Sequence, residues 1–280
     1  MRRNVWGKIM MAFLIAAVAG GSLLLGAEAA ESRKNPREMT IVAHRAGASF
    51  APENTLAALE QTIRDGSAMA EIDVQQLGDG TLIVMHDSNF KRTAGVDRYV
   101  WDIDYDEMRG YEVGSAFSEA YVGETIPTLE QMLKCADGRI TLMIELKYTG
   151  REERLEESVL ELLRQYRMER KCIVGSMNEQ ILQRVKELDS GIPTVFITHN
   201  LSEEQYDRDY ADSYSIEARN MTVEMVERLH SQDKPVYGWT ANNFASARWI
   251  EDCGADGIVT DNVHQAKLFL RLPKKLFASQ

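Results

Sequence analysis

Short apolar runs alternate with longer amphipathic segments along most of the chain. The runs are rich in Val, Ile and Leu, which predicts buried strands, and the segments between them carry apolar residues at helical spacing. The predicted strands cover residues 40–44, 70–76, 140–146, 171–175, 193–198, 212–216, 235–240 and 257–260. This alternation predicts parallel strands that are joined by crossover helices.

The predicted helices fill the intervals between these strands. They lie near residues 55–64, 128–133, 152–168, 178–188, 222–231, 243–252 and 262–270, and a loop with Asp and Tyr joins the strands at 193–198 and 212–216. Strand–helix units that all connect in one sense match a (β/α)₈ TIM barrel with eight units better than an open sheet. No Gly-x-Gly-x-x-Gly follows a strand, so the sequence gives no support for dinucleotide binding.

One region breaks this regularity. Gly78-Asp-Gly80 turns the second strand into a third short run, from Thr81 to Met85. Residues 88–126 then follow, which are rich in Asp, Gly and aromatic residues and lack a sustained period. We expect them to form a small insertion over the mouth of the barrel, with a short helix near 104–109.

The first 30 residues are not part of the predicted fold. Arg2, Arg3 and Lys8 precede an uncharged stretch at 9–26, and Ala27-Glu-Ala29 offers a small-x-small cleavage site, as in a secretory signal. The stretch is also nearly long enough to span a membrane, so an uncleaved anchor is the alternative. The basic residues on its N-terminal side place the rest of the chain outside the cytoplasm. We therefore expect an extracytoplasmic protein, secreted or tethered by residues 9–26, with one domain at 38–272.

Composition limits the classes of partner. The chain has 280 residues, of which 44% are hydrophobic, which suits one domain of barrel size. Its formal net charge of −11 argues against non-specific nucleic-acid binding and against attachment to an anionic membrane, which leaves the N-terminal segment as the expected membrane contact. A phosphate-bearing ligand would need a few placed cations or a metal. Cys135, Cys172 and Cys253 are odd in number and far apart, so they predict neither a disulfide framework nor a zinc site.

Carboxylates recur with a spacing of two on the predicted strands. Glu71 and Asp73 share one face of a strand, opposite Ile72 and Val74. Two such carboxylates inside a barrel would repel each other unless they share a proton or bind a cation, and oxygen ligands suit a hard divalent ion. On another strand Glu145 offers a third oxygen ligand, and Lys147 offers a cation for a phosphate oxygen. The structural alternatives are that Glu71 and Asp73 lie on a solvated strand edge, and that Glu145 and Lys147 form an internal ion pair.

Two histidines lie where predicted strands end. His44 precedes Arg45, and His86 precedes Asp87. A single histidine at a strand end is more often structural, but two of them at the mouth of one barrel can both accept and donate a proton near neutral pH. The remaining histidines, His199, His230 and His264, fall in loop or helix contexts and are expected at the surface.

These residues belong to a longer series of motifs. The series consists of His44-Arg45, Pro52-Glu-Asn-Thr55, Glu71-x-Asp73, His86-Asp87, Lys91-Arg-Thr-Ala-Gly95, Ile126-Pro-Thr-Leu129, Glu145-x-Lys147, Gly238-Trp-Thr240 and Asp256-Gly-Ile-Val-Thr-Asp261. In this order it resembles the glycerophosphodiester phosphodiesterase family over roughly residues 40–265. The resemblance implies a barrel with an insertion after the second strand region and a metal-dependent phosphodiesterase.

The resemblance also assigns roles to individual residues. It implies that His44 and His86 are catalytic, that Glu71, Asp73 and Glu145 bind a divalent metal ion, with Ca²⁺ favoured over Mg²⁺, and that Arg45 and Lys147 contact phosphate. The glycine that usually follows His-Arg in the family is Ala46 here, with Gly47 next. Alanine suits this position unless the backbone there requires a positive φ angle.

Trp239 ends a predicted strand, next to Gly238 and the polar pair Asn242-Asn243. We expect its ring at the barrel mouth, where an aromatic face could pack on the carbon skeleton of glycerol, with Gly238 allowing close backbone approach. The alternative is a packing role between helices on the outside of the barrel.

We therefore expect a hydrolase that converts glycerophosphodiesters into sn-glycerol 3-phosphate and an alcohol. A lysophospholipase-D-like activity is one alternative, and it would require an apolar groove in the insertion, for example at Tyr111, Phe117 and Tyr121. A non-catalytic envelope protein that uses the barrel as a binding module is a second alternative. The oligomeric state is left open.

Overall fold

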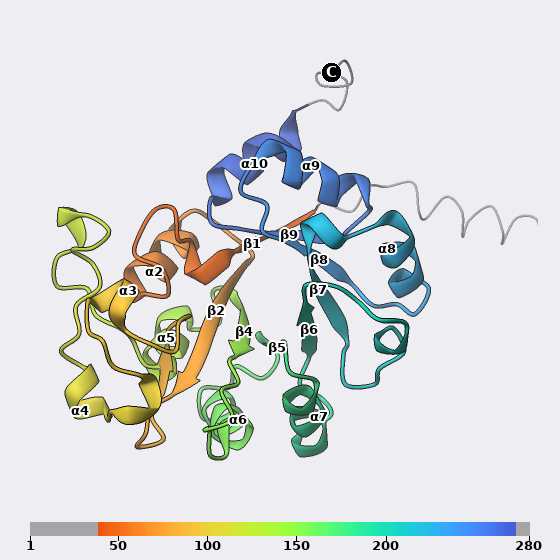
Figure 1. The fold of residues 1–280 in the computed structure, drawn as a ribbon. Helices are drawn as coiled ribbons and strands as arrows, with labels where there is room; N and C mark the ends of the chain where they lie inside the picture. Colours follow the sequence, from red (N-terminus) through yellow and green to blue (C-terminus); the bar gives the residue numbers. More distant parts are fainter. Residues whose placement is uncertain (1–38, 273–280) are drawn as a thin grey trace, which may run out of the picture. The chain divides into compact units, whose positions relative to one another are not determined.

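Eight parallel strands close into a barrel in the computed structural model, which describes residues 39–272 (Figure 1). The strands are β1 (Thr40–Ala43), β2 (Met69–Gln76), β4 (Thr141–Leu146), β5 (Cys172–Ser176), β6 (Thr194–Thr198), β7 (Ser213–Glu217), β8 (Val236–Trp239) and β9 (Gly257–Thr260). They pair in chain order, and β1 pairs in parallel with both β9 and β2, which closes the ring. The expected TIM barrel is confirmed.

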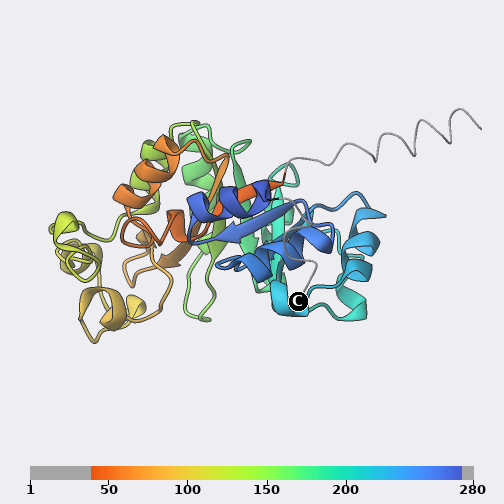
Figure 2. The same ribbon diagram turned by 90° about the horizontal axis from the view of Figure 1, so that it is seen from above.

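Helices surround this barrel (Figures 1 and 2). They are α2 (Leu56–Arg64), α5 (Leu129–Ala136), α6 (Leu155–Gln165), α7 (Glu179–Leu188), α8 (Val223–His230), α9 (Phe244–Asp252) and α10 (Val263–Arg271). Side-chain caps fix several of their starts: Thr55 caps α2, and Thr128 forms a capping box at the start of α5. The link between β6 and β7 contains a single 3₁₀ turn, Glu203–Gln205, in place of an α-helix. The loop expected between the strands at 193–198 and 212–216 is therefore confirmed at this connection.

The strand residues alternate between the barrel interior and the helices. On β8, Val236 packs in a cluster with the surrounding helices, whereas Tyr237 and Trp239 belong to the cluster inside the barrel. A Cβ atom on Gly238 would come within 2.5 Å of Ile250 on α9. Gly238 therefore allows the expected close approach to its backbone, and the group that approaches is Ile250 of α9, on the outside of β8.

The region after β2 is partly ordered into short elements with a small core of their own. It begins with β3 (Leu82–Val84), which pairs antiparallel with β2, and continues with α3 (Lys91–Ala94) and α4 (Tyr105–Met108). Its core includes Phe90, Met108 and Ile126. Figures 1 and 2 show the insertion beside α2 and β2, at one side of the barrel. It therefore borders the mouth at one side, where we expected it to lie over the mouth.

The predicted leader at residues 1–30, with its apolar stretch at 9–26, lies outside the described residues. Within the part of the chain that the structure describes, every helix is too short or too polar to cross a membrane.

Candidate active site

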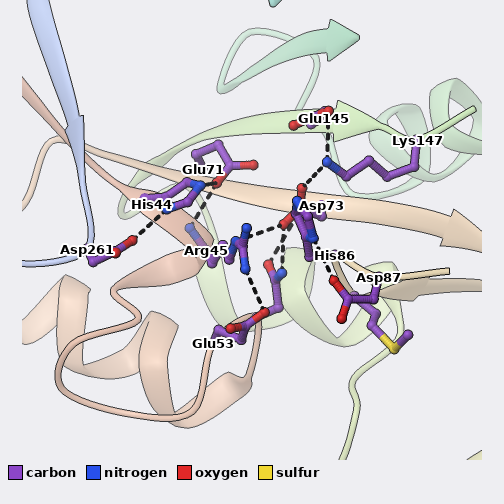
Figure 3. A network of polar contacts seen from close by, with 12 residues as sticks. His44, Arg45, Glu53, Glu71, Asp73, His86, Asp87, Glu145, Lys147 and Asp261 are labelled. Atoms are coloured by element: carbon purple, nitrogen blue, oxygen red, sulfur yellow. Dashed lines mark hydrogen bonds and ion pairs between the residues drawn. The ribbon is translucent and has the colours of Figure 1, made fainter. Parts of the chain in front are cut away.

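Three carboxylates converge inside the barrel, two from the middle of β2 and one from the C-terminal end of β4 (Figure 3). Along β2, Ile72 and Val74 pack outwards, so Glu71 and Asp73 between them face the barrel interior. The parallel register places Glu145 of β4 opposite Asp73. One oxygen from each of the three carboxylates lies within 4.8 Å of the others. Such a spacing lets all three contact one hard cation.

Lysine neutralises only part of this cluster. Lys147 Nζ lies 2.9 Å from Asp73 Oδ1 and 2.9 Å from Glu145 Oε1. Burial would raise the pKa of Asp73, but the charges of Lys147 and His86, together with the hydrogen bonds from Lys147 and Asn54, lower this pKa to about 2. At Glu71, burial and the Asp73 charge act together and raise the pKa to about 8. Glu71 Oε1 is buried without a hydrogen-bond partner among the described residues, so the donor set fits a divalent ion that would pair with this oxygen.

The two histidines each face a carboxylate through Nδ1. His44 follows β1 and lies with Nδ1 2.5 Å from Asp261 Oδ1, while its Nε2 is 4.0 Å from Glu71 Oε2. His86 follows β3, and its Nδ1 lies 2.8 Å from Asp87 Oδ1. These contacts orient both rings and leave Nε2 as the nitrogen that can exchange a proton with a ligand.

The surroundings shift the two histidine pKa values in opposite directions. Burial would lower the pKa of His44, but the hydrogen bond with Asp261 and the negative charge of Glu71 raise it above its ordinary value. Burial lowers the pKa of His86, and the nearby Asp73 charge only partly opposes this effect. The two rings therefore differ in proton affinity, an arrangement in which one ring can donate a proton and the other can accept one.

Two arginines share the carboxylate of Glu53, which lies in the loop between β1 and α2. Arg45 donates from its side chain to Glu53 Oε1 at 3.0 Å, and its backbone N–H donates to Glu71 Oε2 at 2.8 Å. Arg92 of the insertion donates to both oxygens of Glu53, at 2.7 and 2.8 Å, and to Asp87 at 2.6 Å. The insertion is thus linked to Arg45 and to the carboxylate that orients His86.

Trp239 lies at the end of β8 and faces the barrel interior. Its Nε1 donates to the backbone carbonyl of Ser215 at 3.1 Å, and its ring centroid is 5.1 Å from that of His199. His199 is itself held by Glu217, 2.8 Å from its Nδ1. The ring is thus on the mouth side of the interior cluster, and the alternative of packing between outer helices is wrong.

Comparisons with known proteins agree with this geometry. A model of the glycerophosphoryl diester phosphodiesterase family matches residues 44–265. The YhdW protein of Bacillus subtilis (strain 168) is 35% identical over 229 residues, which cover 80% of this chain and 94% of that protein. The chain belongs to the glycerophosphoryl diester phosphodiesterase family. A glycerophosphodiester phosphodiesterase of Caldanaerobacter subterraneus is 29% identical, with 79% of this chain and 93% of that protein covered.

A solved structure adds a fold comparison. A phosphodiesterase of Oleispira antarctica, in complex with the product sn-glycerol-3-phosphate, superposes with a TM-score of 0.78 at 26% identity. The match covers 82% of this chain and 96% of that chain. The family assignment and the fold expected from the motifs are both confirmed.

The chain departs from the family motif at Ala46, and the backbone there is unusual. Arg45, Ala46 and Gly47 have φ angles of 49°, 63° and 107°. Ala46 therefore occupies the left-handed region, where a Cβ atom costs on the order of 1 kcal/mol relative to glycine. The position does need a positive φ, and alanine fills it at the expense of local strain.

Four residues that the sequence reasoning gave no role complete the site. Asp261 holds His44, Glu53 holds Arg45, and Asn54 donates to Asp73 Oδ2 at 2.8 Å. Gln75 donates through Nε2 to the backbone carbonyls that surround His86. Asp261 was detectable, because it directly follows a strand as His44 does. The others depend on contacts between segments that are distant in sequence.

Proposed function

We propose that this protein hydrolyses glycerophosphodiesters to sn-glycerol 3-phosphate and an alcohol, with a divalent metal ion as cofactor. The observation that carries the proposal is the convergence of two carboxylate-oriented histidines, His44 and His86, on a buried acidic cluster with an orphaned oxygen at Glu71. Family membership supports the same reaction. So does the product bound to the Oleispira antarctica relative, since glycerol phosphate is the portion common to all such diesters.

Phosphate binding and proton transfer are assigned to different residues of the chain. Arg45 and Lys147 provide positive charge for the phosphate oxygens, and the planar guanidinium of Arg45 can hold two of them at once. One histidine takes a proton from the attacking hydroxyl and the other gives a proton to the leaving alcohol oxygen, each through Nε2. The attacking hydroxyl belongs to water or to C2 of the substrate's glycerol. Glu71, Asp73 and Glu145 would hold the metal ion, which would supply positive charge to polarise the phosphoryl oxygens and to ease deprotonation of the attacking hydroxyl.

Glu71, Asp73 and Glu145 are the proposed metal ligands. Their oxygens offer the hard donors that Ca²⁺ and Mg²⁺ prefer. We propose Ca²⁺ ahead of Mg²⁺, because Ca²⁺ tolerates irregular carboxylate geometry whereas Mg²⁺ requires a near-ideal octahedron. Arg45, which is held by Glu53, remains near the cluster as a counter-charge.

A lysophospholipase-D-like activity has less support. The aromatic residues proposed for an apolar groove are used in packing: Tyr111 packs edge-on against the buried Phe90, and Tyr121 contacts Phe117 and donates to the Phe50 carbonyl.

The alternative of a catalytically inactive family member that only binds ligands also has less support. Such a protein would be expected to lack at least one histidine or metal ligand, and every residue that the family motif requires for these roles is present here. We propose in addition that the protein acts outside the cytoplasm, secreted or tethered by residues 9–26, on the basis of the basic residues that precede this stretch.

Product analysis tests the proposed reaction. Glycerophosphoglycerol, glycerophosphocholine and a lysophospholipid are incubated with the protein and Ca²⁺, and phosphorus NMR identifies the phosphorylated product. We expect sn-glycerol 3-phosphate from the first two substrates. Release of phosphocholine would show that the other ester bond is cleaved, and binding without turnover would favour the binding-protein alternative. Either result would refute the proposal.

A further inference from the structure

A pocket of about 830 Å³ opens directly beside the proposed catalytic residues. His86, Glu145 and Lys147 line it at the site, and it extends over β5 to the first turns of α7, where Gln180 and Gln183 line it. The volume is sufficient for a small organic ligand. The pocket is therefore continuous with the place where the phosphate is proposed to bind.

The position of the pocket in the barrel indicates which part of a diester enters it. The acidic cluster lies on β2 and β4, and β8, which carries Trp239, is on the opposite side of the ring from β4. If the glycerol portion packs on Trp239 while the phosphate is held at the cluster, the alcohol portion points away from β8. It then lies on the side of His86 and the pocket.

One buried atom in the pocket lacks a partner. Gln75 is 2% exposed, and its Nε2 donates to the carbonyls of Met85, His86 and Asp87 at 3.0, 3.1 and 2.6 Å. These three acceptors fix the orientation of the amide, because a flipped amide would place an acceptor against three carbonyls. Gln75 Oε1 is buried without a hydrogen-bond partner among the described residues. Through its three donated hydrogen bonds, Gln75 holds the segment that carries His86 at the edge of the pocket.

The rest of the lining combines uncharged polar side chains with two apolar ones, Leu146 and Met177. Besides the residues already named, it includes Ser88, Thr149, Ser176 and Asn178, which carry hydroxyl or amide groups. The charged groups that line it have partners within the protein: Lys147 pairs with Glu145, and Glu179 accepts a hydrogen bond from Gln205 at 2.6 Å. Tyr148 is the single aromatic residue among those that line the pocket, so the pocket has no aromatic cage for a quaternary ammonium group.

We propose that this pocket binds the leaving alcohol and selects uncharged polyols, such as glycerol or inositol, over choline and over alcohols without further hydroxyl groups. This inference rests on the proposed function and specifies its substrate class. A polyol has several hydroxyl groups that can exchange hydrogen bonds with the side-chain amides of Gln180 and Gln183 on α7. A methyl group or a quaternary ammonium group has no such donor.

The test compares diesters that share the sn-glycerol-3-phosphoryl group. The values of kcat/KM are measured for glycerophosphoglycerol, glycerophosphoinositol, glycerophosphocholine and the minimal substrate glycerophosphomethanol. The double variant Gln180→Leu/Gln183→Leu changes only exposed residues on α7 that lie outside the catalytic set. The matched control is Gln165→Leu, because Gln165 is also exposed and lies at the C-terminal end of α6, away from the barrel mouth.

We expect the double variant to lose roughly tenfold in kcat/KM on the two polyol substrates, as loss of one or two hydrogen bonds implies. Its kcat/KM on glycerophosphomethanol should be unchanged, and the control should match the wild type on every substrate. Because each variant is compared on the same substrate, differences in leaving-group reactivity cancel.

Two results would overturn the inference while leaving the proposed function intact. One is equal wild-type kcat/KM on polyol, choline and methyl diesters. The other is an equal loss on all substrates in the double variant, which would indicate a general structural effect. Absence of hydrolysis for every diester, in contrast, would refute the proposed function itself.

Discussion

Replacing Glu71 with glutamine separates the metal-binding role of this carboxylate from a purely structural one. The pKa of Glu71 is raised from 4.5 to about 8, first by burial and then by the charge of Asp73. A carboxyl group with a higher pKa in the folded state than in the unfolded state favours folding at low pH, and this contribution is lost as the pH rises towards the folded-state value. Without metal, the wild-type protein should therefore lose stability between about pH 5 and pH 8.

The size of this loss follows from the pKa shift. At about 1.4 kcal/mol per pKa unit, Glu71 alone lowers the free energy of unfolding by about 4 kcal/mol between pH 5 and pH 9. Glutamine has almost the same shape and can still accept the hydrogen bond from the Arg45 backbone N–H. The variant Glu71→Gln should lack this loss, and it should be more stable than the wild type at pH 9 when no metal is bound.

Urea unfolding in chelator at pH 5.5 and pH 9 measures both quantities. The control is Glu60→Gln, because the side chain of Glu60 is 57% exposed, and this variant should follow the wild-type pH dependence. Addition of Ca²⁺ should stabilise the wild type and the control at pH 9 but not Glu71→Gln. If the stability of Glu71→Gln falls with pH as steeply as that of the wild type, the account of this carboxylate is wrong.

Five further substitutions, at four residues, test the remaining roles. His44→Ala and His86→Ala should each lower kcat by roughly 10²–10⁴-fold in a protein that stays folded by circular dichroism. Because His86 borders the alcohol pocket, a p-nitrophenyl leaving group should partly rescue His86→Ala, and an undiminished rate in both variants would contradict the assignment. Arg45→Lys keeps the charge but loses the planar guanidinium that can hold two phosphate oxygens, so kcat/KM should fall by roughly tenfold or more. Unchanged kinetics would place Arg45 outside the site. Trp239→Ala should raise KM for glycerol diesters more than for a phosphodiester without glycerol, and Trp239→Phe should raise it less. Equal losses on both substrates with a lowered melting temperature would indicate packing alone.

Much of the fold could be predicted because hydrophobic periodicity reports directly on burial. The alternation on β2 and β4 placed Glu71 and Glu145 inside the barrel, and the structure confirms this orientation through the outward packing of Ile72 and Ile144. The position of the insertion was less predictable, because its contacts are made by single polar groups, such as Arg92 with Glu53, and not by a periodic apolar face.

The role of Gly238 illustrates a different limit. A glycine in a strand predicts close approach of a neighbouring group, and the structure shows that this group is Ile250 of α9. The sequence alone does not identify this neighbour, because it belongs to a helix that packs on the strand. The same applies to Ala46. The sequence shows that alanine would be strained there if the backbone had a positive φ angle, but only the structure shows that it has one.

Metal dependence of product release is the most direct test of the central claim. The protein is dialysed exhaustively against chelator, and the formation of sn-glycerol 3-phosphate from glycerophosphoglycerol is followed as free Ca²⁺ or Mg²⁺ is restored. The account predicts that the rate falls to background in chelator and returns along a saturable curve with added metal, except in Glu71→Gln. Full turnover after chelator dialysis would contradict it.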